Sequence, residues 1–238
     1  MIRGLVSCVV PVFNGEGHLA ASLDSMLAQT YRPTEVIVVD DGSTDGTPAL
    51  AASYGDRVRY LRQANAGPAT ARNTGVAAAR GEFVAFNDAD DLWRPEKLER
   101  QMAHFARVPS LGVSVTHIRN FFDESAPPDM AGSASPRLLD PKPGFLTPCM
   151  LARRTVFNLV GPFNAELAHA NVTAWFLRAR SLGVVIECLP DVLTDRRLHG
   201  TNRSRARVQH SREEYLRLVK RHLDRRRHGG SGDRSGTP

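Results

Sequence analysis

The stretch EVIVVDDGSTDGTPALAASYG (Glu35–Gly55) predicts a strand, a turn and a helix in direct succession. Its apolar run from Val36 to Val39 is unbroken, which is typical of a strand buried on both faces of a parallel sheet. Asp40 and Asp41 end the run. Glycine, serine and threonine then form a turn with helix-cap residues, and the alanine-rich segment after it is expected to be a helix. This unit decides the fold class, because a parallel sheet is built by repeating it.

The same succession recurs on both sides of this unit. LVSCVVPV (Leu5–Val12) is the expected preceding strand, and apolar residues at helical spacing follow it. After the unit we expect, in order, a strand (57–63), a helix (67–81), a strand (82–88) and a helix with proline in its first turn (95–108). Strands that alternate with helices predict an α/β fold with a doubly wound, mostly parallel sheet and helices on both faces.

The pattern weakens beyond Gly112. Residues 123–144 are rich in proline, serine, glycine and aspartate, so we expect a loop there, a candidate lid over a site. The elements expected after it are a strand, short helix and turn (145–164), a helix ending at Gly183 (172–183), one or two strands (184–200), a basic amphipathic helix (211–228) and a disordered tail (229–238).

The net charge of +6 is unevenly distributed along the 238 residues. Residues 1–195 carry 18 Lys and Arg against 21 Asp and Glu, whereas residues 196–238 carry 13 against 4. Because the main body is not basic, we expect no nucleic-acid partner. The basic end is either a solvated helix with a tail, or a segment that touches an anionic membrane surface or a diphosphate ligand.

The remaining composition indicates a cytoplasmic protein. No apolar run approaches the length needed to span a bilayer, and Pro11 and Asn14 interrupt the first one, so we expect no signal peptide. Cys8, Cys149 and Cys188 are widely spaced and fit neither a disulfide framework nor a zinc site. We expect reduced thiols, and any membrane contact would be peripheral, at the inner face.

Two acidic clusters follow directly after apolar strands. One is Asp40 with Asp41, and the other is Asp88, Asp90 and Asp91 in FVAFNDADDLW. The carboxyl ends of parallel strands meet at one edge of the sheet, where ligands bind. Like charges this close repel each other, and a divalent cation such as Mg²⁺ or Mn²⁺ offsets that repulsion while bridging to ligand phosphates. The D-x-D pair Asp88 and Asp90 is therefore a candidate metal site.

NAGPATARNTG (Asn65–Gly75) adds small residues and one cation to the same region. Glycine and alanine let a ligand approach the backbone, and Arg72 either contacts a phosphate or pairs with one of the aspartates; both roles are compatible. The two common nucleotide-loop signatures, G-x-G-x-x-G and G-x-x-x-x-G-K-[ST], are absent from the sequence.

Four segments together resemble the family 2 glycosyltransferases, which have the GT-A fold and use nucleotide-diphosphate sugars. They are VVPVFNGE, EVIVVDDGSTDGT, NAGPATARNTG and FNDADDLWRPEKLERQ, in the family's order and spacing over roughly the first 105 residues. The likeness resumes more weakly at RRTVFNLVGPFNAEL and RLHGTN. The resemblance implies a nucleotide-sugar-binding half (1–112) and an acceptor-side half (113–210) of one GT-A-type domain.

The resemblance also implies which residues bind the nucleotide. Pro11, Val12 and Phe13 would line the nucleoside pocket. Asp41, with Asp40 beside it, would hold the base or the ribose.

A second implied set surrounds the diphosphate and the sugar. Asp88, Asp90 and the late His199 would hold Mn²⁺ or Mg²⁺, with Asp90 as the direct ligand. Arg72 would lie beside the nucleotide, and Asp91 would orient the sugar or the metal shell. The expected activity is transfer of a sugar to an acceptor of unknown kind (a glycan, a lipid-linked molecule, a peptide or a small molecule), with inversion at the anomeric carbon.

The chain departs from the family where the general base is expected. Asn171 and Val172 occupy the positions of an acidic pair, and neither accepts a proton at neutral pH. Three interpretations stay open: another group such as Glu166 or His169 is the base, the acceptor arrives as an anion, or the protein binds the donor and transfers poorly.

Two further classes of protein compete with this assignment. A nucleotidyltransferase also uses clustered carboxylates and a metal ion. A non-catalytic binding or regulatory protein on the same fold would account for NVTA (Asn171–Ala174) in place of the base.

Overall fold

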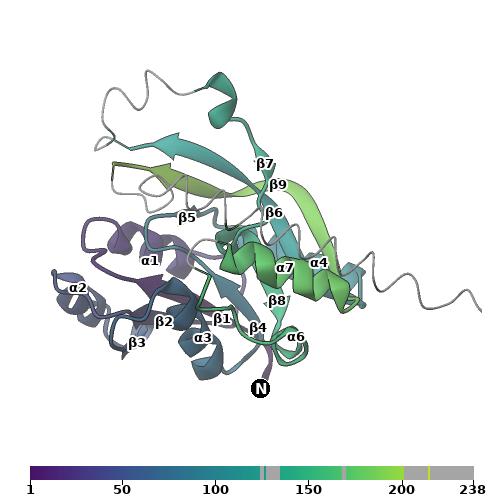
Figure 1. Ribbon diagram of the computed structural model, residues 1–238, viewed down its shortest axis with the longest axis horizontal. Helices are drawn as coiled ribbons and strands as arrows, with labels where there is room; N and C mark the ends of the chain where they lie inside the picture. Colours follow the sequence, from purple (N-terminus) through teal and green to yellow (C-terminus); the bar gives the residue numbers. More distant parts are fainter. Residues whose placement is uncertain (124–125, 127–134, 168–169, 201–213, 215–238) are drawn as a thin grey trace, which may run out of the picture.

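The computed structural model of the chain describes residues 1–123, 126, 135–167, 170–200 and 214. Within these residues, nine strands form one curved sheet in the order β3-β2-β1-β4-β8-β6-β9-β5, with β7 paired to β6 (Figure 1). The strands are β1 (Ile2–Val12), β2 (Thr34–Asp40), β3 (Arg59–Arg62), β4 (Gly81–Phe86), β5 (Leu92–Trp93), β6 (Leu111–Phe122), β7 (Lys142–Pro143), β8 (Met150–Arg153) and β9 (Val185–Leu198).

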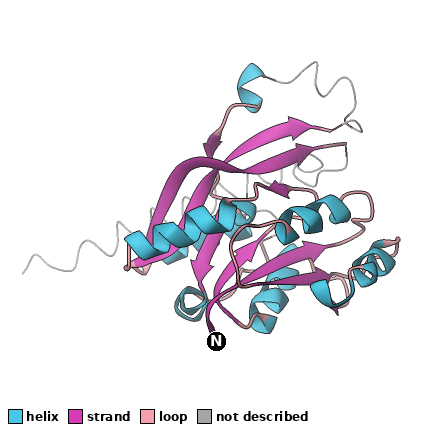
Figure 2. Cartoon of the chain, turned by 180° about the vertical axis from the view of Figure 1, so that it is seen from behind, coloured by secondary structure: helices cyan, strands magenta, loops and turns pink. Residues whose placement is uncertain are grey.

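Helices cover both faces of this sheet (Figure 2). They are α1 (Leu19–Leu27), α2 (Thr47–Ser53), α3 (Pro68–Ala78), α4 (Lys97–Arg107), α6 (Arg154–Val160) and α7 (Asn171–Ser181), with short 3₁₀ turns η1 (Gly55–Arg57), η2 (Pro136–Leu138) and η3 (Thr147–Cys149). Apolar residues of α1, α2 and α4 share one core cluster, and those of α3, α6 and α7 share the other. The result is three layers with a core on each side of the sheet.

The unbroken apolar run of β2 explains this arrangement. Val36 and Val38 belong to one core cluster, and Ile37 and Val39 belong to the other. Successive side chains of a strand point to opposite faces, so a strand between two helix layers needs apolar residues at every position. The predicted α/β fold with helices on both faces is therefore confirmed.

The two halves of the sheet differ in strand direction. β3, β2, β1 and β4 pair in parallel, as the alternation of strands and helices predicts. Beyond β4 the pairing is mixed: β8 is antiparallel to β4 and β6, whereas β6 and β9 are parallel. The long β6 was not among the predicted strands, and β9 is one strand through Pro190 where one or two were expected.

Some predicted segments fall outside the described residues. These are residues 124–125 and 127–134 of the expected 123–144 loop, His169, and the 211–228 helix and 229–238 tail apart from Glu214. The described part of that loop contains η2 and β7. Across the described part of the chain, no helix has the length and apolar character that a membrane span requires.

Gly75 sets how closely α3 packs on β1. A Cβ at this position would lie 2.2 Å from Cγ1 of Val9, a fully buried residue of β1. Val is β-branched and stiff, so it has little freedom to move aside. The glycine therefore holds the helix that carries Arg72 close to the sheet.

Gly75→Ala is expected to lower the free energy of unfolding by about 1–3 kcal/mol, because overpacking forces side chains and backbone to shift. Urea unfolding of both proteins measures the difference. Gly17→Ala is the matched control, since no atom lies within 4 Å of the added Cβ. Equal stability of the two variants would show that α3 does not depend on this close approach.

Candidate active site

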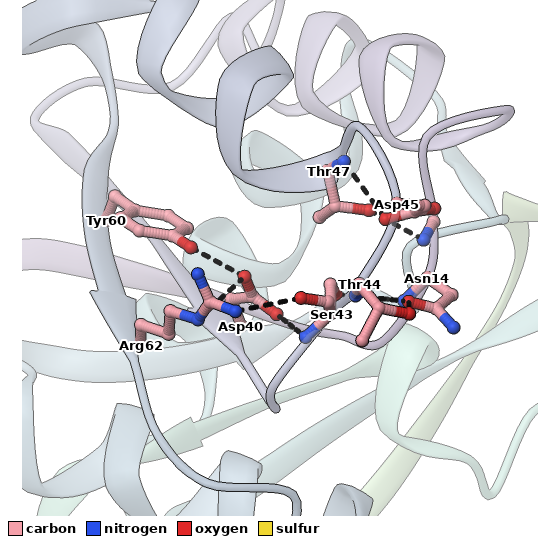
Figure 3. A network of polar contacts seen from close by, with 9 residues as sticks. Asn14, Asp40, Ser43, Thr44, Asp45, Thr47, Tyr60 and Arg62 are labelled. Carbon is pink, nitrogen blue, oxygen red and sulfur yellow. Dashed lines mark hydrogen bonds and ion pairs between the residues drawn. The ribbon is translucent and has the colours of Figure 1, made fainter.

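The carboxyl ends of β1 and β2 are held together by a polar network (Figure 3). Asn14 follows β1 with φ of 51°, a left-handed conformation that asparagine tolerates better than most residues. Its side-chain Oδ1 accepts a hydrogen bond from the backbone N–H of Thr44 at 2.8 Å, and its own N–H donates to Oγ of Ser43 at 2.9 Å. The turn after β2 is thereby fixed against the end of β1.

Asp40 lies at the centre of this network and is fully buried. Its carboxylate accepts hydrogen bonds from the N–H of Ser43 at 2.8 Å and the hydroxyl of Tyr60 at 2.5 Å, and Arg62 lies 4.0 Å away. Burial, together with the hydrogen bond to Asp40, raises the pKa of Tyr60 to about 12, so the phenol stays a donor. Asp40 thus contacts the chain itself, and its predicted contact with a nucleotide stays a prediction.

Asp41 organises the loop after β3. Its Oδ1 accepts from Nε2 of Gln63 at 2.8 Å and from the N–H of Ala66 at 2.9 Å, and its Oδ2 accepts from the N–H of Gly67 at 2.8 Å. Oγ1 of Thr74 donates to Oε1 of Gln63 at 2.6 Å. The buried Asp41 carboxylate therefore fixes the loop that runs from β3 to the start of α3.

Of the three residues predicted for the nucleoside pocket, Phe13 differs from the others in exposure. Pro11 and Val12 pair with β2 inside the sheet and are buried. Phe13 is 50% exposed just beyond the strand end. Phe13 is therefore the one of the three whose side chain is accessible, and the contact of all three with a nucleoside stays a prediction.

Arg72 pairs with Asp88, the first aspartate of the acidic loop (Asp88–Asp91). Its Nη2 donates to Oδ1 of Asp88 at 2.8 Å, and the Arg72 side chain is nearly buried while that of Asp88 is 37% exposed. Nε of Arg72 is buried and has no hydrogen-bond partner within the described residues. The ion pair that the sequence allowed for Arg72 is therefore present.

Asp90, the second aspartate of the acidic loop, contacts the histidine that follows β9. Nε2 of His199 lies 3.0 Å from Oδ2 of Asp90, whose side chain is 30% exposed. The rings of His199 and His18 lie 4.6 Å apart between centroids. Burial first, and then the charges of His199 and Arg197, lower the pKa of His18, so the neutral imidazole is favoured there. The structure thus brings Asp90 and the late histidine together, although they are 109 positions apart.

The third aspartate is buried. Asp91 is 2% exposed, and its Oδ1 accepts from the backbone N–H of Arg197 at 3.0 Å. Burial, with the neighbouring Asp90 and Asp88 adding to it, raises the pKa of Asp91 well above the usual value. Nε of Arg197 also donates to the carbonyl of Asp90 at 3.0 Å, and its Nη1 pairs with Asp123 at 3.0 Å. Arg197 therefore joins the acidic loop to the end of β6.

Sequence reasoning missed several of these supports. Oγ of Ser22 on α1 donates to the carbonyl of Asp88 at 3.1 Å and accepts from Nδ2 of Asn87 at 3.0 Å. Arg197 is the first residue of the RLHG segment, which is the one signal that pointed to it. Nothing local marked Ser22, because its partners are 65 and 66 positions away.

A buried lysine begins the helix after the acidic loop. Lys97 is fully buried, and its Nζ donates to Oε1 of Gln101 at 2.8 Å and lies 4.1 Å from the centroid of the Trp93 ring. Burial lowers the pKa of Lys97 to about 8. This amine is enclosed beneath the loop and does not reach its exposed carboxylates.

Residues of the second half of the chain are tied to the same edge by hydrogen bonds to α3. Asn73 of α3 donates to the carbonyl of Phe163 and accepts from its N–H, each at 2.9 Å. Glu166, a candidate base, is exposed in the turn that follows, and its N–H donates to Oδ1 of Asn164. Asn171 is buried at the start of α7 and donates to the carbonyl of Leu167.

The residues at the acidic loop fit a divalent ion in part. Among the residues that the structure describes, no group of three or more His, Cys, Asp or Glu is arranged to hold a metal by itself. Asp90 and His199 do present an oxygen and a nitrogen 3.0 Å apart. Mg²⁺ is often bound through one or two carboxylates, with substrate phosphates and water completing its shell. The donor set is therefore suited to an ion that binds together with a phosphate ligand.

Solved structures with similar folds define the class of this domain. TarS of S. aureus superposes with a TM-score of 0.71 and 24% identity, over 90% of this chain and 65% of that one. A mannosyltransferase from Pyrobaculum calidifontis has a TM-score of 0.69 and 21% identity, over 98% and 65%. At these identities the likeness concerns the fold, and it is the GT-A type.

The profile of Glycosyl transferase family 2 matches residues 7–159, and the chain belongs to this family. An uncharacterised glycosyltransferase of Rickettsia typhi is 44% identical over 98 residues, 41% of this chain and 31% of that protein. One from a Nostoc species is 36% identical over 137 residues, 56% and 42%. The chain spans less than half the length of these relatives.

Asp41→Asn is expected to lower the free energy of unfolding by about 2–3 kcal/mol, because one amide N–H₂ would then face a backbone N–H donor. Chemical denaturation measures this loss. Asp56→Asn, at an exposed position, is the matched control and is expected to change stability by less than about 0.5 kcal/mol. If both variants were equally stable, Asp41 would not be what holds the loop.

Proposed function

We propose that the chain transfers a sugar from a nucleotide-diphosphate sugar to an acceptor, with Mn²⁺ or Mg²⁺ held by Asp90 and His199 and with Asp88 beside them. The observation that carries the proposal is the approach of Asp90 and His199 to 3.0 Å at the carboxyl edge of the sheet. Membership in Glycosyl transferase family 2 supports it.

The solved neighbours support the choice of donor and metal. TarS was solved with UDP-GlcNAc, and the Pyrobaculum mannosyltransferase with GDP-Man and Mn²⁺. These ligands belong to those proteins, and for this chain they define the donors to test first.

The residues at the carboxyl ends of β1, β2 and β4 have different roles in this mechanism. Phe13 offers its exposed ring to the base, and the loop that Asp41 shapes borders the nucleoside. Arg72 keeps the Asp88 carboxylate in place and adds positive charge beside the diphosphate. A bound divalent ion supplies neutralisation of the charge that develops on the leaving diphosphate. Asp91, held by Arg197, orients the loop beneath the sugar.

The reaction is a single displacement with inversion. The acceptor enters over the half that follows Gly112 and attacks the anomeric carbon from the face opposite the diphosphate. A glycan, a lipid-linked molecule, a peptide or a small molecule all remain open as acceptor. The cytoplasmic location, with peripheral membrane contact through the basic C-terminal segment, stays a prediction.

One observation favours a second candidate, a protein that binds the donor without efficient transfer. The first turn of α7 contains no acidic residue, and Asn171 there cannot accept a proton. Metal-dependent turnover on any acceptor, including water, would exclude this alternative.

A panel of nucleotide sugars tests the proposal without knowledge of the acceptor. Binding and slow hydrolysis of UDP-N-acetylglucosamine, GDP-mannose and related donors are measured with Mn²⁺, with Mg²⁺ and with a chelator. We expect at least one donor to bind in a metal-dependent way. Asp90→Asn should weaken that binding more than tenfold, because it removes an anionic ligand of the ion.

Asp56→Asn is the control, since it removes the same charge at an exposed position away from the site. The proposed metal site would be contradicted if the donor bound equally well with the metal ion and with a chelator. It would also be contradicted if Asp90→Asn left donor affinity unchanged. Release of diphosphate from a nucleoside triphosphate, with no use of nucleotide sugars, would instead indicate a nucleotidyltransferase.

A further inference from the structure

His18 is the last residue before α1, and its ring lies against the candidate metal site. The centroids of the His18 and His199 rings are 4.6 Å apart, with an angle of 49° between the ring planes. Nδ1 of His18 lies 3.9 Å from Oδ2 of Asp123, and the His18 side chain is 25% exposed. Among the described residues, this side chain makes no hydrogen bond that caps α1. Its contacts are therefore with the site and not with its own helix.

The turn that carries His18 is fixed to the entry of α2. The N–H of Gly15 donates to Oγ1 of Thr47 at 2.8 Å, and the N–H of Glu16 donates to Oδ2 of Asp45 at 3.2 Å. Figure 3 shows Asp45 and Thr47 in the segment that follows β2. The N–H of His18 then donates to the carbonyl of Gly15 at 3.1 Å. The backbone of His18 is thus held in place, as a residue that orients a neighbour requires.

The first turn of α1 contacts both segments that supply the candidate metal ligands. The N–H of Ser22 donates to the carbonyl of His18 at 3.2 Å, and its Oγ donates to the carbonyl of Asp88 in the acidic loop at 3.1 Å. Ser22 therefore fixes the backbone of the acidic loop, while His18 contacts the ring of His199. One helix end thereby links the two segments that meet at Asp90.

His199 lies where the sheet no longer holds the chain. β9 ends at Leu198, and the next residue brings its Nε2 to 3.0 Å from Oδ2 of Asp90. Groups that surround a metal-ligating histidine set the orientation of its ring, and they tune how well the nitrogen binds the ion. The ring of His18 is in the position to do this, because it packs on the imidazole itself.

We propose that His18 is a positioning residue for the divalent ion, an inference that rests on the proposed function. Its ring holds the His199 imidazole toward Asp90, so that one nitrogen and one oxygen reach the same ion. The role depends on the aromatic ring of His18 and needs no bond between His18 and the ion. His18 thus affects the ion through His199.

Binding of Mn²⁺ in the presence of UDP or GDP tests this role without an acceptor. The EPR signal of free Mn²⁺ gives the Kd, with a protein-free sample as the reference. We expect His18→Ala to weaken Mn²⁺ binding by about 10–100-fold, the usual cost of losing an outer partner of a metal ligand. His18→Phe should stay within about threefold of wild type, because aromatic rings pack on each other in similar tilted arrangements.

A double-mutant cycle shows whether His18 acts through His199. In a His199→Ala background, where Asp90 and the diphosphate oxygens remain as ligands, His18→Ala should change the Kd for Mn²⁺ by less than about twofold. The same loss in both backgrounds would show that His18 acts independently of His199, and the proposal would be wrong. Equal losses in His18→Ala and His18→Phe would show that the ring is not what matters, and would also overturn it.

The matched control is His117→Ala, which removes a partly exposed imidazole from β6 and should leave the Kd for Mn²⁺ unchanged. The melting temperature of each variant reports whether it folds. If His18→Ala does not fold, His18→Gln takes its place, since glutamine is polar and of similar size but has no ring. The same loss of Mn²⁺ affinity is expected for it.

The role of His18 and the proposed function fail in different ways. If wild type binds Mn²⁺ together with UDP or GDP, and His18→Ala binds it with equal affinity, the role of His18 is overturned and the proposed function stands. If wild type binds no Mn²⁺ with either nucleotide, the metal site of the proposed function is overturned, and the role of His18 with it.

Discussion

Repulsion among Asp88, Asp90 and Asp91 is the constraint on which the rest of the site depends. Each carboxylate is balanced by a different element: Arg72 of α3, His199 beyond β9, and the backbone N–H of Arg197 within β9. Because burial and mutual charge raise the pKa of Asp91, these contacts are needed to keep three acids in one loop. The acidic loop thereby fixes where α3 and β9 lie relative to β4.

The strands and helices of the first half of the chain could be predicted from sequence because their signals are local. The apolar runs of β1 and β2, and the aspartates that end β2 and β4, lie within short windows. β6 was missed because buried polar residues interrupt its pattern. Ser114 is fully buried, and its hydroxyl lies 3.0 Å from Nδ1 of His104, so it behaves as a core residue that no apolar pattern marks.

The contacts that complete the site are not local. Arg197 reaches Asp90 and Asp123 across 107 and 74 positions. No spacing rule predicts such pairs, since they arise from the pairing of β9 with β5 on one side and with β6 on the other. For the same reason nothing local indicated that Glu214 accepts a hydrogen bond from the N–H of Ala170 at the start of α7. The sequence predicted that acidic residues follow β2 and β4, while tertiary structure decided which charges meet.

Lys97 has a consequence for chemical modification of the protein. Acylating reagents react only with a neutral amine, and burial, which lowers the pKa of Lys97 to about 8, also encloses that amine. Its complete enclosure by Trp93, Gln101 and the neighbouring core keeps such reagents out. The rate of acylation at this position therefore reports how often α4 separates from the sheet, which makes Lys97 a built-in probe of local opening.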